Sequence, residues 1–232
     1  MIDYRKIYSS KADAYDLLVT REDYQQNITK SLQAIRPLEN LEVVDLGTGT
    51  GRFARILSSQ VKHILAMDIS SHMLRKAKER LINSSSQNWD IAQADNLRLP
   101  LRDRSFDMTI AGWSLGHLTG WYPDAWPVMI DQCLSEMKRI AGPGGTAIIL
   151  ETLGTGRETP LPPTEALAGY YSQMVDDHGF TASWVRSDYH FQSLDEAVHL
   201  TEFFFGEELA QQVAQSKSTF LPECTGIWWL NV

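Results

Sequence analysis

Residues 43–51 read VVDLGTGTG, and this stretch decides which fold the chain can adopt. The apolar run over residues 41–46 predicts a buried strand, and residues 52–59 carry apolar side chains at helical spacing. The glycines therefore lie where a first strand turns into a first helix. Glycine at such a turn permits positive φ angles and lets a ligand approach the backbone closely. The sequence thus predicts a ligand-binding loop at this position.

The next hundred residues repeat this alternation of short apolar runs and helical stretches. Further strands are expected over residues 63–67, 89–94, 106–111 and 146–151, and further helices over residues 71–81 and 129–140. Strands that alternate with helices imply right-handed βαβ units and a mostly parallel sheet. The expected fold is α/β, a Rossmann-like doubly wound sheet with helices on both faces.

Beyond residue 152 the pattern changes. We expect a loop over residues 154–163, a helix over 164–178, a strand over 181–191, a helix over 193–215 with a break at Gly206, and a last strand over 223–232. These elements would complete a sheet of about seven strands. The last strand is expected to run antiparallel, at or near an edge.

Composition excludes several classes of protein. Of 232 residues 43% are hydrophobic, and 21 Lys and Arg against 29 Asp and Glu give a net charge of −8. Nucleic acids and anionic membranes normally bind to a basic surface, so an acidic chain argues against both. Only a local basic groove would still allow such binding. No apolar run approaches the ~18 residues of a membrane span, and the start lacks a signal-peptide core. Two cysteines, Cys133 and Cys224, are too few for a disulfide framework. We expect a cytoplasmic protein.

The acids around the glycine loop indicate which ligand it holds. The dinucleotide fingerprint needs Gly or Ala at position 52, where this chain has Arg52. Asp45, two residues before Gly47, would repel a pyrophosphate and attract an ammonium or sulfonium group. Asp68 ends the second strand, 23 residues after Asp45, where an acid can accept both ribose hydroxyls. Alternatively, the Asp68 carboxylate would stabilise the N-terminus of the following helix through its interaction with the helix dipole. Ser70 or Ser71 could fill that role instead.

Asp95 follows the third strand and could accept a hydrogen bond from an exocyclic amine; its alternative is a loop acid in water. With these residues the sequence resembles the class I S-adenosylmethionine-dependent methyltransferases, in the group (methyltransferase type 11) that includes the ubiquinone and menaquinone biosynthesis C-methyltransferases. The resemblance covers residues 4 to about 152. The matching stretches are residues 43–51, 68–74, 94–95, 99–107 and 137–145.

The resemblance implies particular cofactor contacts. Gly47 and Gly49 would face the methionine part, Asp45 its ammonium group, and Asp68 the ribose. Ile69 and Met73 would pack on the adenine, and Asp95 would accept from its amine. The full implied set of cofactor-binding residues is Tyr8, Asp45, Gly47, Thr48, Gly49, Gly51, Asp68, Ile69, Met73, Ala94, Asp95, Asn96, Leu97, Gly112 and Trp113. S-adenosyl-L-homocysteine would be the product, and the alternative for Tyr8 is an exposed helix aromatic.

The resemblance also implies how the chain is organised. A single methyltransferase domain would span residues 1–232. It would have a helical lid over residues 1–30, a cofactor-binding core over 41–152, substrate-side insertions and helices over 153–222, and the last strand over 223–232.

Methyl transfer needs alignment more than enzyme nucleophiles, and a base helps only when the acceptor must lose a proton. His117 is the first candidate base, and Glu151, at the end of the fifth strand, is the second catalytic candidate and could bind a polar or cationic acceptor. Their alternatives are a cofactor-packing or helix-start residue for His117 and a cap for Glu151. No acid pair is placed for magnesium, so no metal is expected.

The acceptor is expected to be a small molecule. Residues 111–114 read AGWS instead of the Asn/Asp-Pro-Pro-aromatic tetrad of enzymes that methylate amide or nucleobase nitrogens. Aromatic residues are dense in the second half, so a few could line an apolar or cationic acceptor site. Residues 203–205 (FFF) are interpreted as helix packing and not as a ligand site.

O-, C- and N-methylation stay open, as do monomer and homodimer. The alternative functions are a non-catalytic S-adenosylmethionine-binding regulatory module and an NAD-type oxidoreductase.

Overall fold

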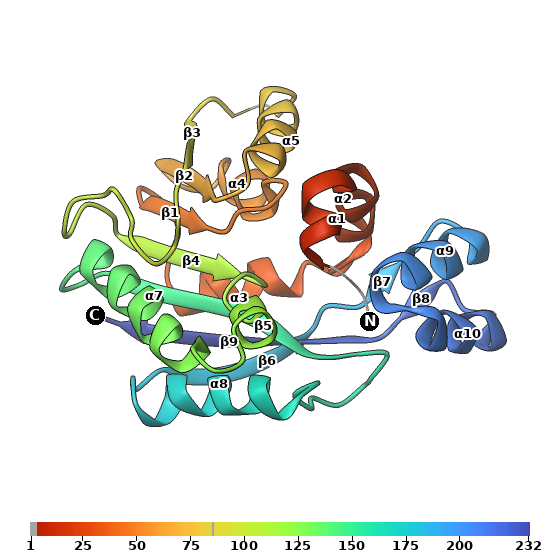
Figure 1. Cartoon of the computed structure of the whole chain (residues 1–232). Helices are drawn as coiled ribbons and strands as arrows, with labels where there is room; N and C mark the ends of the chain where they lie inside the picture. The colour runs from red at the N-terminus through yellow and green to blue at the C-terminus, as the bar shows by residue number, and fades with distance from the viewer. Residues whose placement is uncertain (1–3, 85) are drawn as a thin grey trace.

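A seven-stranded sheet forms the centre of the molecule in the computed structural model, which describes residues 4–84 and 86–232. The strand order is β3-β2-β1-β4-β5-β9-β6 (Figure 1). The strands are β1 (Glu42–Leu46), β2 (His63–Asp68), β3 (Trp89–Gln93), β4 (Met108–Gly112), β5 (Thr146–Thr155), β6 (Thr181–Arg186) and β9 (Glu223–Asn231). A separate two-stranded sheet pairs β7 (Tyr189–His190) with β8 (Phe220–Leu221).

The first five strands run parallel, and β1 is the turning point of their order. Val43 pairs with Ile64 of β2 on one side and with Met108 of β4 on the other. The chain therefore winds outward in both directions from β1, and such a switch point opens a crevice at the carboxyl ends of the strands. The predicted doubly wound, mostly parallel sheet is confirmed.

The predicted antiparallel last strand is also confirmed. β9 runs antiparallel to β5, from Thr146 opposite Asn231 to Thr155 opposite Glu223, and antiparallel to β6 on its other side. β6 takes the edge, so β9 lies one strand in from it. This position explains why residues 223–228 of β9 are buried.

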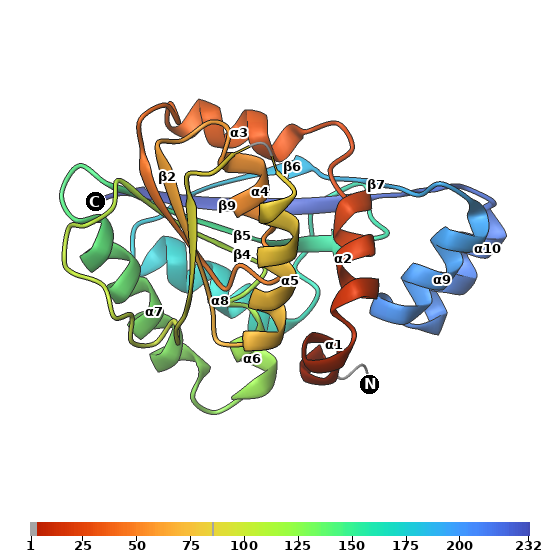
Figure 2. The same ribbon diagram turned by 90° about the horizontal axis from the view of Figure 1, so that it is seen from above.

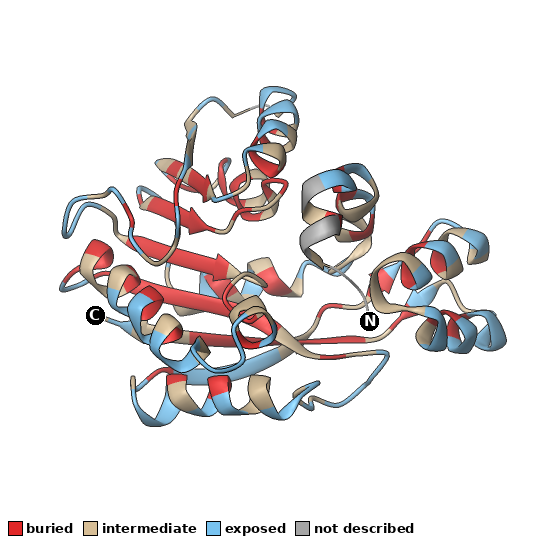
Figure 3. Ribbon diagram, viewed as in Figure 1, coloured by how far each residue is buried: buried red, intermediate tan, exposed pale blue. Residues whose placement is uncertain are grey.

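Helices cover both faces of the sheet, as Figures 1 and 2 show. One face carries α7 (Trp126–Ala141) and α8 (Glu165–Asp176), and the other carries α3 (Asn27–Ile35), α4 (Arg52–Leu57) and α5 (Ser71–Ile82). Strand residues alternate between the two cores: Val44 and Ile149 face the first, whereas Val43 and Ile148 face the second. Alternation with both faces buried produces the continuous apolar runs of the sequence, and the central strands are buried in Figure 3.

The remaining helices gather beyond the carboxyl ends of the strands. They are α1 (Tyr4–Ser10), α2 (Ala12–Arg21), α6 (His117–Trp121), α9 (Leu194–Phe205) and α10 (Glu207–Ser216). An ion pair between Asp16 and Arg80 fixes α2 to α5. Leu18 of α2 packs into a third core with Leu200 and Val213 of the C-terminal helices. α2 and α9 thus lie side by side beyond this end of the sheet (Figure 2).

Several element bounds differ from the sequence expectations. β5 runs to Thr155, although a strand over residues 146–151 and a loop from residue 154 were expected. The strand expected over residues 181–191 breaks at Ser187, whose buried hydroxyl bonds Thr225 while β7 turns away to pair with β8. α3 begins at Asn27, inside the expected lid, and packs on the sheet through Ile28 and Leu32. The helix expected over residues 129–140 begins earlier, at Trp126. The predicted break at Gly206 is confirmed, with φ of 98° between α9 and α10.

Within the described residues, no helix is both long and apolar enough to cross a membrane.

Candidate active site

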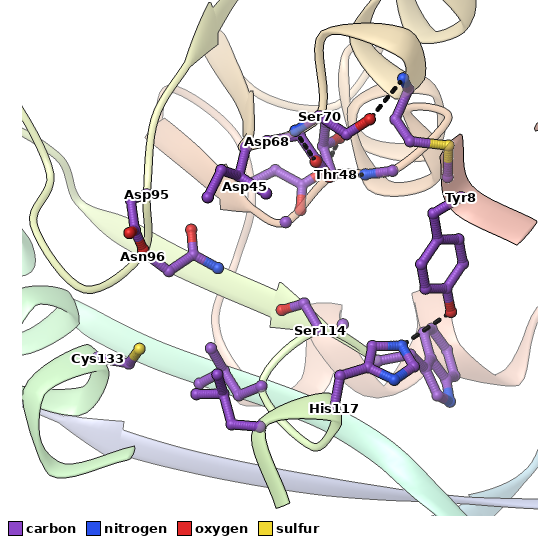
Figure 4. Close-up of a pocket in the computed structure, with 18 of the residues that line it drawn as sticks. Tyr8, Asp45, Thr48, Asp68, Ser70, Asp95, Asn96, Ser114, His117 and Cys133 are labelled. Atoms are coloured by element: carbon purple, nitrogen blue, oxygen red, sulfur yellow. Dashed lines mark hydrogen bonds between the residues drawn. The ribbon is translucent and has the colours of Figure 1, made fainter. Parts of the chain in front are cut away.

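The glycine loop between β1 and α4 forms the floor of a cavity of about 420 Å³ (Figure 4). Gly47 and Gly49 have φ of 69° and 57°, which favour glycine strongly over residues with a side chain. A Cβ on Gly47 would lie 2.4 Å from Cβ of Ser114 in the loop after β4. The loop therefore presents bare backbone to the cavity, as the sequence predicted.

Asp45 lines the cavity beneath this loop. Its side chain is 1% exposed and accepts a hydrogen bond from the Thr48 hydroxyl. Burial raises the pKa of Asp45 to about 7, although the Thr48 hydrogen bond acts in the opposite direction. A buried carboxylate is stabilised when a cation approaches it. The position thus suits an ammonium group and opposes a phosphate.

Asp68, at the end of β2, accepts two backbone hydrogen bonds. Gly49 N–H donates to Oδ2 at 2.9 Å, and Ser70 N–H donates to Oδ1 at 2.8 Å. Burial raises the pKa of Asp68, and these hydrogen bonds oppose the shift. The Ser70 hydroxyl caps α5 by accepting from Met73 N–H. Since Ser70 fills the capping role, Asp68 is free to use its other lone pairs on a pair of hydroxyls in the cavity.

The far end of the cavity is built for a flat, weakly polar group. Ile69 is 63% exposed, an unusual degree for a large apolar side chain, and lines the wall with Met73. Asp95 is exposed and its Oδ1 accepts from Leu97 N–H at 2.9 Å. Oδ1 of Asn96 is buried without a hydrogen-bond partner in the described part of the chain. A ligand that donates hydrogen bonds here would satisfy it, because unpaired buried acceptors are costly.

Trp113 closes the opposite end in a strained conformation. It has φ of 50°, and its N–H donates to the Leu150 carbonyl at 2.7 Å. The guanidinium of Arg52 lies 4.1 Å from the centre of its ring and forms an ion pair of 2.7 Å with Glu22. Non-glycine residues held at positive φ cluster at functional sites. Arg52 and Glu22 therefore fix the tryptophan that forms this wall.

His117 begins α6 and is half-buried among the rings of Tyr4, Tyr8 and Trp121. Its Nε2 lies 2.8 Å from the Tyr8 hydroxyl, and its ring stacks on Trp121 with centroids 4.9 Å apart. Burial lowers the pKa of His117 to about 4, so the imidazole is neutral at pH 7. A neutral imidazole with so low a pKa is a weak proton acceptor, and the contact joins α1 to α6 across the cavity mouth.

A second cavity, of about 1130 Å³, adjoins the first. Both are lined by Tyr8, Tyr15, Arg52, Trp113, His117 and Trp121. Glu151 lines only the second cavity; it is 4% exposed, and its Oε1 accepts from Gly116 N–H at 2.8 Å. Burial raises the pKa of Glu151 to about 8. The two cavities give a cofactor-sized space and an acceptor-sized space with a common wall.

Most of the predicted cofactor residues line the first cavity: Tyr8, Asp45, Gly47, Thr48, Gly49, Asp68, Ile69, Met73, Ala94, Asp95, Asn96, Leu97, Gly112 and Trp113. Gly51 does not line it. It caps α4 with φ of 83°, and a Cβ there would lie 3.2 Å from Ala77 of α5. Gly51 therefore serves helix packing.

Sequence reasoning missed several residues of the second cavity. Glu22, Arg52 and Glu223 come from three distant segments, so no local spacing connects them. The packing expected for residues 203–205 is seen for Phe204 and Phe205, which pack against the third core, and both side chains also line this cavity. Phe204 contacts the ring of Tyr4 at 5.2 Å between centroids. In the sequence, the density of aromatic residues was the one feature that indicated a second ligand site.

Comparison with known proteins agrees with this geometry. Residues 44–149 match the family model described as a methyltransferase domain. A malonyl-[acyl-carrier protein] O-methyltransferase of Marinomonas sp. (strain MWYL1) is 34% identical over 65% of this chain and 52% of that protein. A ubiquinone/menaquinone biosynthesis C-methyltransferase UbiE of Francisella tularensis (strain SCHU S4 / Schu 4) is 32% identical over 76% of this chain and 65% of that protein.

Among solved structures, a SAM-dependent methyltransferase from Aquifex aeolicus superposes with a TM-score of 0.62 at 20% identity, covering 100% of both chains. This likeness shows the fold. The chain spans between about half and two thirds of the length of the two curated relatives above. Residues 44–149, somewhat less than half of the chain, are therefore similar to a methyltransferase domain.

Proposed function

We propose that this chain is an S-adenosylmethionine-dependent methyltransferase that acts on a small-molecule acceptor. One observation carries the proposal: the glycine-loop cavity, with Asp45 and Asp68 in its wall, adjoins a second cavity across His117 and Trp113. The bound cofactor would supply an electrophilic methyl group on a sulfonium. The chain would supply alignment, which can lower the barrier of such a displacement by about 7–11 kcal/mol in favourable cases.

Each end of the first cavity has a defined task in this proposal. Asp45 and the bare loop at Gly47 hold the ammonium and carboxylate end, and Asp68 holds the ribose hydroxyls. Ile69 and Asn96 receive the adenine. The orphaned Asn96 oxygen and the exposed Ile69 side chain support the fit, because a purine with an amino group satisfies the first and covers the second.

The expected lid and substrate-side segments fit the same proposal. Tyr8 of α1 lies within hydrogen-bond distance of His117, which supports a lid that would close over the cofactor cavity through α1 and α2. Residues 153–222 supply Phe204 and Phe205 to the acceptor cavity. The chain would act in the cytoplasm, as a monomer or homodimer, and its charge of −8 supports an acceptor other than nucleic acid.

The open second cavity favours an enzyme over a non-catalytic regulatory module. In such a module the acceptor space would be filled by side chains, whereas here it measures about 1130 Å³. The buried Asp45 and the side chain of Arg52 in the loop disfavour a nicotinamide dinucleotide, because its pyrophosphate needs a close, uncharged approach.

Calorimetry tests the proposal directly. The protein is titrated with S-adenosylmethionine, with S-adenosylhomocysteine and with NADH as the control ligand. We expect both adenosyl ligands to bind and NADH to give no heat. Failure of both adenosyl ligands to bind folded protein would refute the proposal, and binding of NADH alone would revive the oxidoreductase alternative.

A further inference from the structure

The second cavity has an unusual balance of charge. It is lined by the carboxyl groups of Glu22, Glu151 and Glu223 and by the guanidinium groups of Arg52 and Arg157. Arg157 is exposed to solvent, and Arg52 is committed to Glu22. Two buried carboxyl groups, those of Glu151 and Glu223, are therefore left without a cationic partner in the described part of the chain.

The partners of these two carboxyl groups are neutral. Glu151 accepts from Gly116 N–H at 2.8 Å, and Glu223 accepts from the Thr152 hydroxyl at 2.8 Å. Burial raises the pKa of each to about 8. His117 adds no positive charge, since its pKa is lowered by burial. A cation that entered the cavity would therefore meet two carboxyl groups that form no ion pair in the described part of the chain, with Arg52 acting on Glu223 without an ion pair between them.

The walls of the cavity are aromatic, which suits an organic cation. The rings of Tyr4, Tyr8, Trp121 and Phe204 line it together with His117. Aromatic faces attract ammonium groups, most strongly where water is excluded. A metal ion fits less well, because no group of three or more possible metal ligands gathers within residues 4–84 and 86–232.

We propose that the methyl acceptor is a small amine, held as its ammonium form between these aromatic rings and the carboxyl groups of Glu151 and Glu223. The inference rests on the proposed function and deepens it by assigning the acceptor class. A phenol or enol would bring no positive charge to either carboxyl group, and a carboxylate acceptor would be repelled by each of them once it has lost its proton.

Glu151, on the wall of the second cavity, can accept the proton that the acceptor amine must lose. The bound ammonium gives one proton to the Glu151 carboxylate, which leaves a neutral amine with a free electron pair. That nitrogen pair forms the bond to the methyl carbon while the carbon–sulfur bond breaks and its electrons stay on sulfur. The products are a methylated ammonium ion and a neutral thioether. Once the ammonium has lost its charge, burial again raises the pKa of Glu151, so the carboxyl group retains the proton.

Calorimetry with a matched set of probes tests the acceptor class. S-adenosylhomocysteine binding is measured first, and the saturated protein is then titrated with 2-phenylethylamine, 2-phenylethanol and phenylacetate at pH 7. Each titration is repeated in two buffers with different ionisation enthalpies. We expect the amine to bind about tenfold more tightly than the alcohol. Its binding should release protons, since a cation lowers the pKa of both carboxyl groups.

Variants test whether Glu151 causes the preference for the amine over the alcohol. Glu151→Gln should reduce the ratio of amine to alcohol affinity and the proton release, while S-adenosylhomocysteine affinity stays the same. Glu158→Gln, at an exposed position, is the matched control and should change neither. Equal binding of amine and alcohol, preference for phenylacetate, or no amine binding by protein that binds S-adenosylhomocysteine would overturn the inference alone. If the unmodified protein does not bind S-adenosylhomocysteine, the proposed function itself is overturned.

Discussion

Replacing Asp68 by alanine gives the sharpest test of the cofactor cavity. Each carboxylate oxygen of Asp68 accepts one backbone N–H, from Gly49 at 2.9 Å and from Ser70 at 2.8 Å. One lone pair per oxygen is then left for a ribose hydroxyl. Hydrogen bonds to a charged group contribute roughly 1.5–3 kcal/mol. We expect Asp68→Ala to weaken S-adenosylhomocysteine binding by about 2–3 kcal/mol, which is an increase in Kd of about 30- to 150-fold.

The assay is isothermal titration, with thermal unfolding of every variant measured alongside. Asp68→Asn keeps one oxygen acceptor and should lose less affinity than the alanine variant. Asp90→Ala is the matched control, because the Asp90 side chain is 76% exposed on the neighbouring β3 and bonds only His63 at the surface. A folded Asp68→Ala protein whose Kd stays within about twofold of the unmodified value would refute the ribose assignment.

Three further changes probe packing, titration and the lid. Gly112→Ala should destabilise the fold by about 1–3 kcal/mol in a denaturant titration, because the new Cβ would lie 2.1 Å from the Phe53 ring. The free energy of unfolding should fall as pH rises from about 5 to 8, by roughly 1.4 kcal/mol per pH unit for Glu151. The folded carboxyl, with a pKa of about 8, keeps a proton that the unfolded chain has already lost. Glu151→Gln should flatten this slope in part. Tyr8→Phe should lower the melting temperature by a few degrees, because it removes the 2.8 Å contact with His117.

Each of these changes has a matched control elsewhere in the chain. Gly120→Ala should be neutral, because a Cβ there would meet no atom within 4 Å. Glu158→Gln should leave the pH slope unchanged, and Tyr24→Phe, at a ring that is 45% exposed, should leave the melting temperature unchanged. Equal effects in a variant and its control would contradict the structural reason given for that variant.

Local spacing predicted the glycine loop and the acids of the first cavity, whereas the remaining lining residues came from the family resemblance. Residues 43–51 and Asp68 lie at the ends of neighbouring parallel strands, and parallel strands bring their carboxyl ends to one edge. Asp95 follows β3 for the same reason. The glycines could be assigned because a strand-to-helix turn has few solutions. Gly51 was the exception, since sequence spacing cannot separate a glycine that contacts ligand from one that admits a neighbouring helix.

The second cavity depends on contacts that spacing cannot reveal. The Arg52–Glu22 pair joins α4 to the segment after α2, and Glu223 reaches the cavity only because β9 inserts between β5 and β6. Phe204 shows the same helical periodicity whether it faces a core or a cavity. Tertiary arrangement, not local preference, decides the role of each of these residues.

Arg52 lines both cavities. At its position a dinucleotide-binding loop has a small residue, and the small residue lets helix and strand approach closely behind the phosphates. Here the side chain extends along the cavity wall instead, lies 4.1 Å from the Trp113 ring centre and pairs with Glu22. Because Glu22 neutralises its charge, Arg52 offers little attraction to an anion and serves as a rigid support for the strained tryptophan. The same residue that removes the dinucleotide pattern therefore contributes to the wall between the two cavities. That wall would hold the acceptor nitrogen and the methyl group in line.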